Sequence, residues 1–205
     1  MATNRSQARL GRPRLRDRAP HDVESLVDVA VGEFNEKGYD GVSMDDLARA
    51  AGVTKAALYH HVSGKQELLE RAFDRALDAL FAVLEEPEAL DGPAVERVRH
   101  VLRRTVGILV DQQPAVALLL RVRAGSPIGD AALARRRDFE HSVAELVREA
   151  ADHGDVRADL DPALLIRLAF GTISSIAEWY RPDAPLGDRQ LVEAIDAFLT
   201  RGFRG

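Results

Sequence analysis

Apolar residues recur along this chain, from about residue 20 to its end, at the three- and four-residue spacing of an α-helix. Near the start of this region Val27, Val31 and Phe34 lie four and three positions apart, so they share one helix face. Glycine and proline residues interrupt the pattern, and no segment shows the strict alternation of apolar and polar residues that is typical of a strand. The chain is therefore predicted to have an all-α fold.

The interruptions divide the pattern into three short helices followed by six longer ones. The expected ranges are 23–37, 43–51 and 54–61 for the short helices, and 65–86, 94–112, 114–125, 127–154, 162–181 and 189–203 for the longer ones. Two boundaries carry clear chemical signals. Ser43 and Asp46 fit a capping box, and Asp161 precedes a proline, which is favoured at the first helical position. Residues 87–93 begin and end with proline and are expected to form a loop.

Charge is distributed unevenly along the chain. The formal net charge is −5, but residues 1–20 contain six arginines and a single acid, so they carry +5 and the remainder carries −10. This segment is predicted to be a flexible basic arm, and such arms commonly contact DNA phosphates or grooves. Arg12 and Arg14 are the expected DNA-contacting residues of the arm. The alternative is a solvated tail that has no partner.

The composition excludes several classes of protein. Cysteine is absent, which rules out disulfide bonds and thiolate ligands, and the 46% of hydrophobic residues is sufficient for a core. No apolar stretch approaches the roughly 18–20 residues that cross a bilayer, and no apolar run follows the basic start as in a secretory signal. The sequence also lacks a phosphate-binding glycine loop, an activated nucleophile and clustered metal ligands. We therefore expect a cytoplasmic protein that is not an enzyme and has no cofactor, metal ion or membrane partner.

Residues 43–61 follow the plan of a helix-turn-helix, in which two short helices are joined by a tight turn, here at Gly52. On the second helix Leu58 and Val62 are four positions apart and are expected to point inward. The opposite face is made of residues that have no hydrophobic reason to be buried, namely Lys55, Ala56, Tyr59 and His60. This face is the candidate recognition surface.

The residue types on this face suit the major groove of DNA. Ala56 is small enough for the helix to enter a groove about 12 Å wide, where Lys55 and His60 can donate hydrogen bonds to base edges. The hydroxyl of Tyr59 can reach a phosphate. Lys65 adds its charge to the free N–H groups at the start of the next helix, which makes a second phosphate contact.

Several short motifs follow one another between about Val23 and Leu69. They are Phe34, Lys37-Gly38-Tyr39, Ser43-Met44, Leu47-Ala48, Ala51-Gly52-Val53-Thr54, Leu58-Tyr59, His61, and Lys65 with Leu68. In this order they resemble the DNA-binding domain of the TetR family of bacterial transcriptional regulators. Two residues depart from the family pattern, because Val62 stands where phenylalanine is usual and Gly64 stands where serine or asparagine is usual.

The resemblance implies a role for each residue of the recognition surface. Thr54, Tyr59 and Lys65 are expected to contact phosphates. Lys55, Ala56 and His60 are expected to face bases. Ser43, at the start of the first short helix of the motif, completes the expected DNA-binding set.

The resemblance also implies the organisation of the whole chain. Residues 21–67 form a three-helix helix-turn-helix DNA-binding domain, and residues 68–205 form a six-helix ligand-binding and dimerisation domain whose last two helices pair with a second subunit. The sequence fits, since the helix at 162–181 mixes small and large apolar residues and the helix at 189–203 carries a broad apolar stripe. The expected dimer-interface residues are Leu168, Ser175, Trp179, Leu191, Ile195 and Phe198. The alternative is that both helices complete the core of a monomer.

The sequence gives little information about the identity of the ligand. His100, Arg103 and Arg121 are candidates for recognising an anion, although intramolecular ion pairs explain such residues as well. The segment 178–182, Glu-Trp-Tyr-Arg-Pro, resembles an ending found in TetR regulators of acyl-CoA and lipid catabolism. This resemblance implies an acyl-CoA or a related hydrophobic acid, with Trp179 in the ligand site. The competing interpretation places Trp179 at the dimer interface.

These features predict a sequence-specific DNA-binding transcriptional regulator that acts as a repressor. A homodimer would place two recognition helices about 34–36 Å apart on a near-palindromic operator of double-stranded DNA. An unknown small-molecule effector would release it by favouring the conformation that does not fit DNA, with the helix at 65–86 as the lever. The alternative is an architectural or cell-division-linked DNA-binding protein without an effector.

Overall fold

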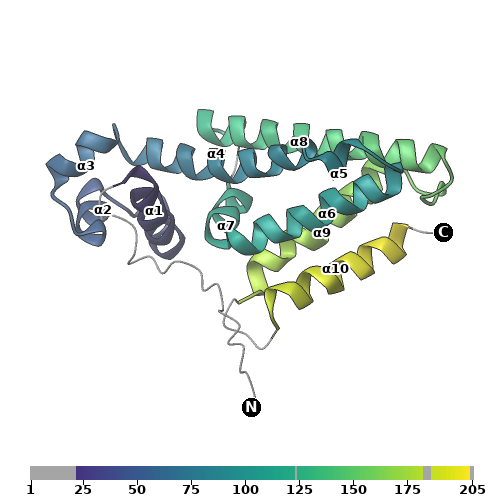
Figure 1. Cartoon of the computed structure of the whole chain (residues 1–205). Coiled ribbons are helices and arrows are strands. Elements are labelled where there is room, and N and C mark those ends of the chain that lie inside the picture. The colour runs from purple at the N-terminus through teal and green to yellow at the C-terminus, as the bar shows by residue number, and fades with distance from the viewer. Residues whose placement is uncertain (1–21, 123, 182–185, 204–205) are drawn as a thin grey trace, which may run out of the picture.

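The computed structural model describes residues 22–122, 124–181 and 186–203, and within these ranges it contains helices and no strand (Figure 1). The all-α prediction is therefore confirmed for the described residues. The helices are α1 (Val23–Lys37), α2 (Met44–Ala51), α3 (Lys55–His61), α4 (Lys65–Leu84), α5 (Pro87–Leu90), α6 (Ala94–Asp111), α7 (Gln113–Arg121), α8 (Pro127–Asp152), α9 (Pro162–Trp179) and α10 (Asp188–Phe203).

Two segments differ from the sequence prediction. Residues 87–93 were expected to be a loop, but they begin with the single helical turn α5, in which the Asp91 N–H donates to the Pro87 carbonyl at 2.9 Å. Proline at the first helical position stabilises such a turn, because it has no N–H to leave unsatisfied. Helix α7 ends at Arg121 instead of near residue 125, because the backbone of Val122 turns to an extended conformation.

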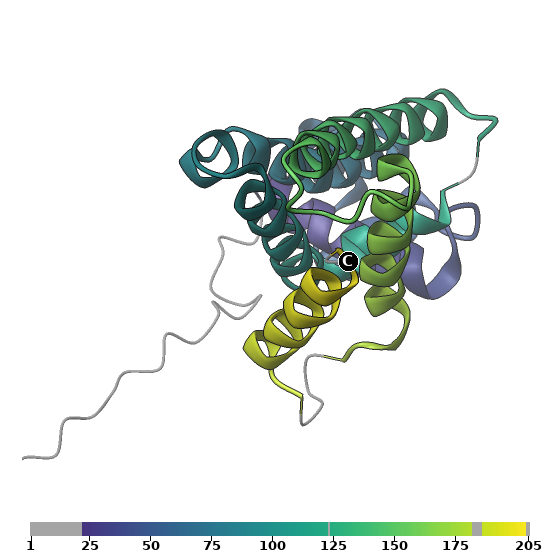
Figure 2. The same ribbon diagram turned by 90° about the vertical axis from the view of Figure 1, so that its right-hand side faces the viewer.

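The helices are arranged around the long helix α4 (Figures 1 and 2). At one end of α4 lie α1, α2 and α3, and along the rest of its length lie the helices of a larger body. In the body, α8 packs on α4, α6 and α9, and α10 packs on α6. Helix α4 therefore connects both parts of the molecule as one continuous element.

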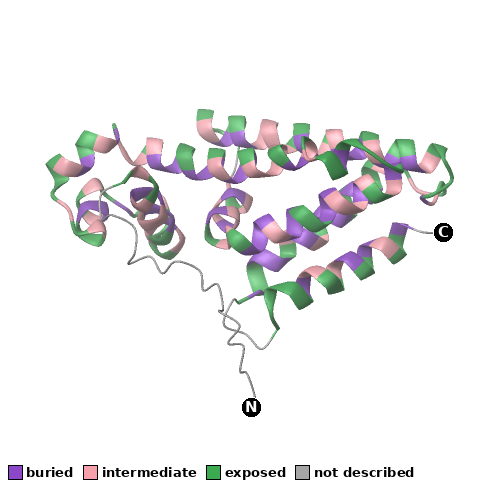
Figure 3. Ribbon diagram, in the orientation of Figure 1, coloured by how far each residue is buried: buried purple, intermediate pink, exposed green. Residues whose placement is uncertain are grey.

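Two hydrophobic cores follow this division. One contains buried residues of α1, α2, α3 and the first half of α4, and it also includes Ala115 and Leu119 from α7 and Ala132 from α8. The other lies in the body among α4 to α10. Buried positions run along the inner faces of the helices in Figure 3. The predicted boundary between residues 67 and 68 falls inside α4 and stays a prediction.

None of the helices in the described part of the chain is long and apolar enough to cross a membrane.

Candidate DNA-binding surface and effector cavity

Each helix of the DNA-binding end begins on a polar side chain. The Asp22 carboxylate accepts from the Ser25 N–H at 2.7 Å, and the Thr54 hydroxyl accepts from the Ala57 N–H at 3.1 Å. Ser43 and Asp46 form the predicted capping box, in which each side chain accepts a hydrogen bond from the backbone N–H of the other residue. The hydrogen bonds from the Ser43 hydroxyl and backbone lower the pKa of Asp46. These caps fix the starts of α1, α2 and α3 locally.

The turn between α2 and α3 requires a glycine. Gly52 lies in the left-handed region, with a φ of 71°, and its N–H donates to the last turn of α2. A residue with a Cβ is strained in this conformation. The turn therefore sets the direction in which α3 leaves α2.

Helix α3 presents the predicted recognition surface to solvent. Leu58 is 1% exposed and Val62 is 3% exposed, so both pack inward as expected. On the opposite side the four predicted residues, Lys55, Ala56, Tyr59 and His60, are all exposed. The Tyr59 side chain is 48% exposed although it is large and apolar in its ring. An exposed face of this kind is available to a partner.

An acid lies next to this surface, and the sequence interpretation did not use it. The Lys55 ammonium donates to the Asp45 carboxylate at 2.9 Å, and this hydrogen bond raises the pKa of Lys55. Asp45 lies in the first turn of α2, ten residues away in sequence. In the free protein, one of the three ammonium protons of Lys55 is thus bound to an internal partner that competes with DNA for its charge.

Two of the predicted DNA-contacting residues already have structural partners. The Ser43 hydroxyl donates to the Asp46 carboxylate at 2.5 Å, so its one proton is committed to the capping box. The Lys65 ammonium donates to the carbonyls of Tyr39 and Val42, at 2.9 Å each, and lies 4.4 Å from the centre of the Tyr39 ring. Lys65 therefore ties the start of α4 to the loop after α1, which the sequence analysis did not anticipate.

The other members of the DNA-binding set are placed differently. Arg12 and Arg14 lie outside the described residues.

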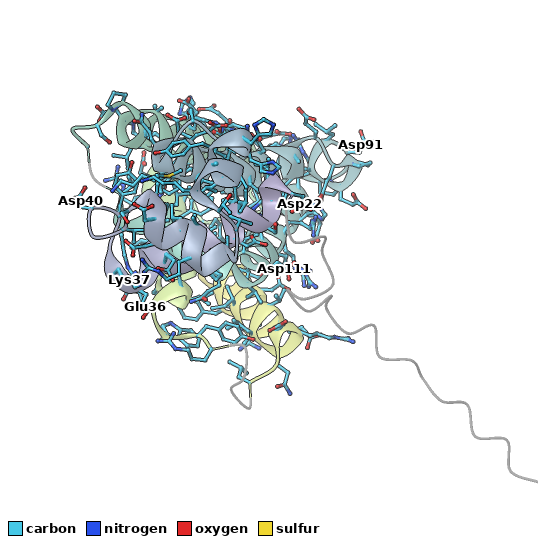
Figure 4. The ribbon with its side chains drawn as sticks, turned by 90° about the vertical axis from the view of Figure 1, so that its left-hand side faces the viewer. Asp22, Glu36, Lys37, Asp40, Asp91 and Asp111 are labelled. Atoms are coloured by element: carbon cyan, nitrogen blue, oxygen red, sulfur yellow. The ribbon has the colours of Figure 1, made fainter. Side chains whose placement is uncertain are left out.

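Helix α1 crosses this end of the molecule, with Asp22 at its start and Glu36 and Lys37 at its end (Figure 4).

The residues predicted to bind the ligand do not meet at one site. His100 pairs with Glu86 at 2.6 Å, Arg103 pairs with Asp196 at 3.0 Å, and Arg121 donates to Asn35 at 3.2 Å. Trp179 is 52% exposed at the end of α9. None of the four lines the cavity described below, and their role in ligand binding stays a prediction. Intramolecular pairing, the alternative interpretation, accounts for His100, Arg103 and Arg121.

Asp196 illustrates this pairing. It is almost buried between α6 and α10, where Arg99 and Arg103 donate to its carboxylate at 2.8–3.0 Å. The hydrogen bond from Arg99 lowers the pKa of Asp196. A buried carboxylate needs such partners, so Arg103 has a structural reason to be where it is.

One group of residues has the composition of a metal site. In the described part of the chain, ligand atoms of Glu86, Glu88 and His100 lie within 4.8 Å of one another. The Arg104 guanidinium, however, donates to both carboxylate oxygens of Glu86, at 2.9 and 3.0 Å, and this pairing lowers the pKa of Glu86. A cation would have to displace the arginine, so the group is better described as an ion-pair network.

The body contains a cavity that the sequence analysis expected but did not locate. Its empty space is about 540 Å³, a volume that includes the part open to solvent. Its walls come from α4, α6, α7, α8 and α9, and most of them are apolar. The lining residues are Ala76, Leu77, Leu80, Thr105, Ile108, Leu109, Val116, Leu119, Leu120, Arg136, Phe139, Glu140, Phe170, Ile173 and Ser174.

Two of the cavity walls are attached directly to α1. From α7, the Pro114 carbonyl accepts a hydrogen bond from the Asn35 side chain at 2.8 Å, and Arg121 donates to the same Asn35. From α4, Arg75 donates to Glu24 at 3.1 Å and to Asp28 at 2.8 Å. Partners this distant in sequence leave no local signal, which explains why the sequence analysis missed them.

The last two helices expose apolar side chains. On α9, Leu164, Leu168 and Trp179 are 44%, 56% and 52% exposed, and on α10 Phe198 is 64% exposed. Ser175 is exposed on the same side of α9, at helical spacing from Leu168 and Trp179. Five of the six residues predicted for the dimer interface are therefore at least partly exposed. Leu191 is not, because it is 2% exposed in the core of the monomer, and its assignment to the interface is corrected.

The fold and these two sites define a helix-turn-helix DNA-binding protein with a separate effector domain. Residues 26–72 match the family model described as bacterial regulatory proteins, tetR family, and residues 91–203 match the model described as Tetracyclin repressor-like, C-terminal domain. Together the matches cover more than half of the chain. The chain belongs to the TetR family, and it is a DNA-binding regulator of transcription.

Individual relatives agree with this assignment. SCO3833 of Streptomyces coelicolor A3, a member of the TetR transcriptional regulator family, is 49% identical, and the match covers 88% of this chain and 91% of SCO3833 with a TM-score of 0.80. The HTH-type transcriptional repressor KstR2 of Mycobacterium tuberculosis is 27% identical over an alignment of 201 residues, and the match covers 91% of this chain and 96% of KstR2. AibR, solved in complex with isovaleryl coenzyme A and operator DNA, is 24% identical with a TM-score of 0.72 over 87% of this chain and 97% of AibR. At this identity the likeness to AibR shows the fold alone.

Proposed function

We propose that two copies of this chain bind a near-palindromic operator through α3 and repress transcription until an effector enters the cavity of the body. The observation that carries the proposal is the exposed face of α3, where Lys55, Ala56, Tyr59 and His60 lie opposite the buried Leu58. Lys55 and His60 read base edges in the major groove, and Ala56 allows the helix to approach closely.

Contacts to the DNA backbone come from the ends of α3 and α4. The Thr54 hydroxyl accepts the capping hydrogen bond, so its proton is free to reach a phosphate, as is the exposed hydroxyl of Tyr59. Helix α4 begins at Gly64 without a side-chain cap, which leaves its first N–H groups to a phosphate. Lys65 has one ammonium proton beyond the two that bind carbonyls, and it adds positive charge at the same point.

Dimerisation uses the exposed apolar faces of α9 and α10. Leu168, Trp179 and Phe198 are each more than half exposed, and burying them against a second copy removes this apolar area from water. A twofold dimer also explains how two recognition helices reach successive turns of the major groove. Ile195, partly buried beneath Phe198, supports this face from the core of the monomer.

Release follows from the attachment of the cavity to α1. Helices α4 and α7 line the cavity and also hold α1 through Arg75 and Asn35. These helices can lie closer together or further apart. An effector that binds one of these arrangements more tightly shifts the population towards that arrangement and changes the spacing of the two α3 helices. The cavity favours this mechanism over an architectural DNA-binding protein without an effector.

The effector is a hydrophobic metabolite, because most of the cavity lining is apolar. Acyl-CoA thioesters and related hydrophobic acids are the first class to test. A regulator that acts on operator DNA works in the cytoplasm, where the DNA is, and its chemistry consists of binding, without a catalysed reaction.

Footprinting on the DNA upstream of the chain's own gene and of neighbouring genes tests the proposal. We expect a protected near-palindrome with two half-sites about one helical turn apart. Lys55→Ala or His60→Ala should weaken operator binding by roughly 5- to 150-fold and unrelated DNA much less. Lys65→Ala should weaken binding to all DNA and also lower the melting temperature, because two buried carbonyls lose their partner. Equal losses on both DNAs for all three variants would contradict the division into base and phosphate contacts.

A further inference from the structure

An open cleft adjoins the cavity between α8 and α9. It has a volume of about 680 Å³ and is lined by Leu133, Arg136, Arg137, Glu140, Arg167, Phe170 and Gly171. Three of these residues, Arg136, Glu140 and Phe170, also line the cavity. The cleft is therefore the outer compartment of a two-part site, and the apolar cavity is the inner compartment.

The outer compartment carries an excess of positive charge. Arg136 is neutralised by Glu140, since its Nε donates to the carboxylate at 3.1 Å. Arg137 and Arg167 are exposed, and neither has an ion-pair partner among the residues that the structure describes. Two unpaired guanidinium groups at the mouth of a cavity form a binding site for an anion.

The inner compartment has the opposite character. Apart from Arg136 and Glu140 at its border, its lining is uncharged, and the hydroxyl of Thr105 is already bonded to the Val101 carbonyl at 2.8 Å. An ionised group placed there would lose its hydration without gaining a charged partner. An aliphatic chain, by contrast, gains free energy from each buried methylene group.

We infer that the effector is an amphipathic anion whose charged headgroup binds Arg137 and Arg167 in the cleft while its aliphatic tail occupies the cavity. The inference rests on the proposed function in so far as this cavity is taken as the effector site. It adds the two headgroup residues and the requirement for a negative charge. Neither arginine belongs to the set that the sequence analysis proposed.

Two natural sources supply this chemistry, a free carboxylate and the phosphates of a coenzyme A thioester. Both present an anion next to an aliphatic tail, and guanidinium groups bind both. Four probes distinguish these sources, namely octanoate, octanoyl coenzyme A, 1-octanol and coenzyme A. The alcohol has the tail without the charge, coenzyme A has the phosphates without the tail, and the other two combine a tail with one of the two headgroups.

Isothermal titration of the full chain with these four probes tests the inference. We expect octanoate, octanoyl coenzyme A or both to bind at least tenfold more tightly than 1-octanol, because the alcohol has the tail without the charge. If octanoyl coenzyme A binds, coenzyme A alone should bind at least tenfold more weakly than this thioester. The anion that binds more tightly identifies the headgroup. Binding of octanol as tight as that of both anions, binding of coenzyme A as tight as that of its thioester, or no binding by any probe would overturn the inference.

Substitutions at Arg137, Arg167 and Glu140 test where the headgroup of the anion binds. Arg137→Gln with Arg167→Gln should weaken the tighter anion at least tenfold and leave 1-octanol unchanged. Arg148→Gln is the matched control, because Arg148 lies on the same helix and is paired with Glu145 outside the cleft. Glu140→Gln should strengthen anion binding severalfold, since it frees Arg136 and removes a negative charge. A gain cannot arise from misfolding, so an unchanged or weaker affinity of this variant would count against the assignment.

The titrations do not involve DNA, so they fail or succeed independently of the proposed function. If the anion binds as expected but does not release operator DNA in a mobility-shift assay, the site stands and its regulatory role is wrong. If no operator is found, the proposed function fails and the titrations still decide the chemistry of the cleft.

Discussion

Helices α1, α2 and α3 of the DNA-binding end each begin on a capping side chain. In the body, α8 and α9 also begin on one, but α4, α5, α6 and α7 do not. The body also contains several ion pairs between segments that are distant in sequence. Examples are Arg97 with Glu149, Arg99 with Asp196, and Arg135 with Asp74 and Asp78.

This difference bears on how a regulator can work. Caps and a glycine turn specify the DNA-binding end over a few residues, so it can move as a rigid unit. The body depends on contacts between helices, and it encloses an internal cavity whose occupation can change those contacts. Under the proposed function, the link between the two regions through Asn35 and Arg75 is where occupation of the cavity would be converted into movement of α3.

The largest effect is expected from a substitution in the hydrophobic core of the DNA-binding end. Leu58→Ala removes a fully buried side chain from the core beneath α3 and should lower the free energy of unfolding by about 2–5 kcal/mol. Operator binding should be lost. Denaturant unfolding followed by circular dichroism measures the change, and Ala56→Ser on the exposed face of the same helix is the control. If the body has its own stability, octanoyl coenzyme A or octanoate should still bind it; loss of this binding would show that the two regions are one cooperative unit.

The second prediction concerns the link between the regions. Asn35→Ala removes the hydrogen bond to the Pro114 carbonyl and the acceptor for Arg121. Operator affinity without effector should change little, but the effector concentration needed for release should shift by roughly 2- to 30-fold, the usual range for residues that carry coupling. Mobility-shift titrations measure the release. Gln66→Ala, on the exposed side of α4, serves as control.

A smaller effect of opposite sign is expected at the DNA surface. Asp45→Asn removes the internal partner of Lys55 and a negative charge next to the DNA. Operator affinity should rise roughly two- to fivefold, the scale of an exposed ion pair, and the gain should shrink at high salt. Fluorescence anisotropy at two salt concentrations measures it. A loss of affinity would mean that Asp45 orients Lys55 for binding instead of competing with DNA for it.

The smallest effect concerns the start of α4. Hydrogen bonds from the Ser63 backbone, from Arg71 and from the Ser63 hydroxyl lower the pKa of Glu67 to about 2. Because this value lies below the ordinary value of 4.5, the charged carboxylate stabilises the fold above pH 4.5, and this contribution is lost as the pH falls towards 2. Glu67→Gln should lower stability at pH 7 by roughly 0.5 kcal/mol, with the gap to the parent protein narrowing below pH 4.5. Thermal unfolding between pH 7 and pH 3 provides the measurement, and a gap that stays constant would assign the effect to packing.

The difference between local caps and contacts that are distant in sequence explains which parts of the molecule were predictable. The helix-turn-helix was predicted down to the side of α3 that faces solvent, because Ser43, Gly52 and Thr54 act on residues within four positions of themselves. The positions of His100 and Arg121 were not predictable. Their partners, Glu86 and Asn35, lie 14 and 86 residues away, and no periodicity connects them.

The proposed dimer surface lies between these extremes. Periodicity predicted that α9 and α10 carry apolar faces, and Leu168 and Phe198 are indeed exposed. Leu191 belongs to the same stripe of α10 but faces the body of its own chain. Periodicity assigns a residue to a face of its helix, but it does not say whether that face meets another subunit or the monomer core.

By itself the sequence determined the helical periods, the caps and the turn that hold α3 with its polar residues outward. Tertiary structure alone decided which helices enclose the cavity, which arginines are paired and which remain unpaired at its mouth, and which helices hold α1. The physical reason is the range of the interactions. Capping and helix periodicity act within a turn or two of the chain, whereas a cavity and an ion pair between helices exist only after segments far apart in sequence have packed together.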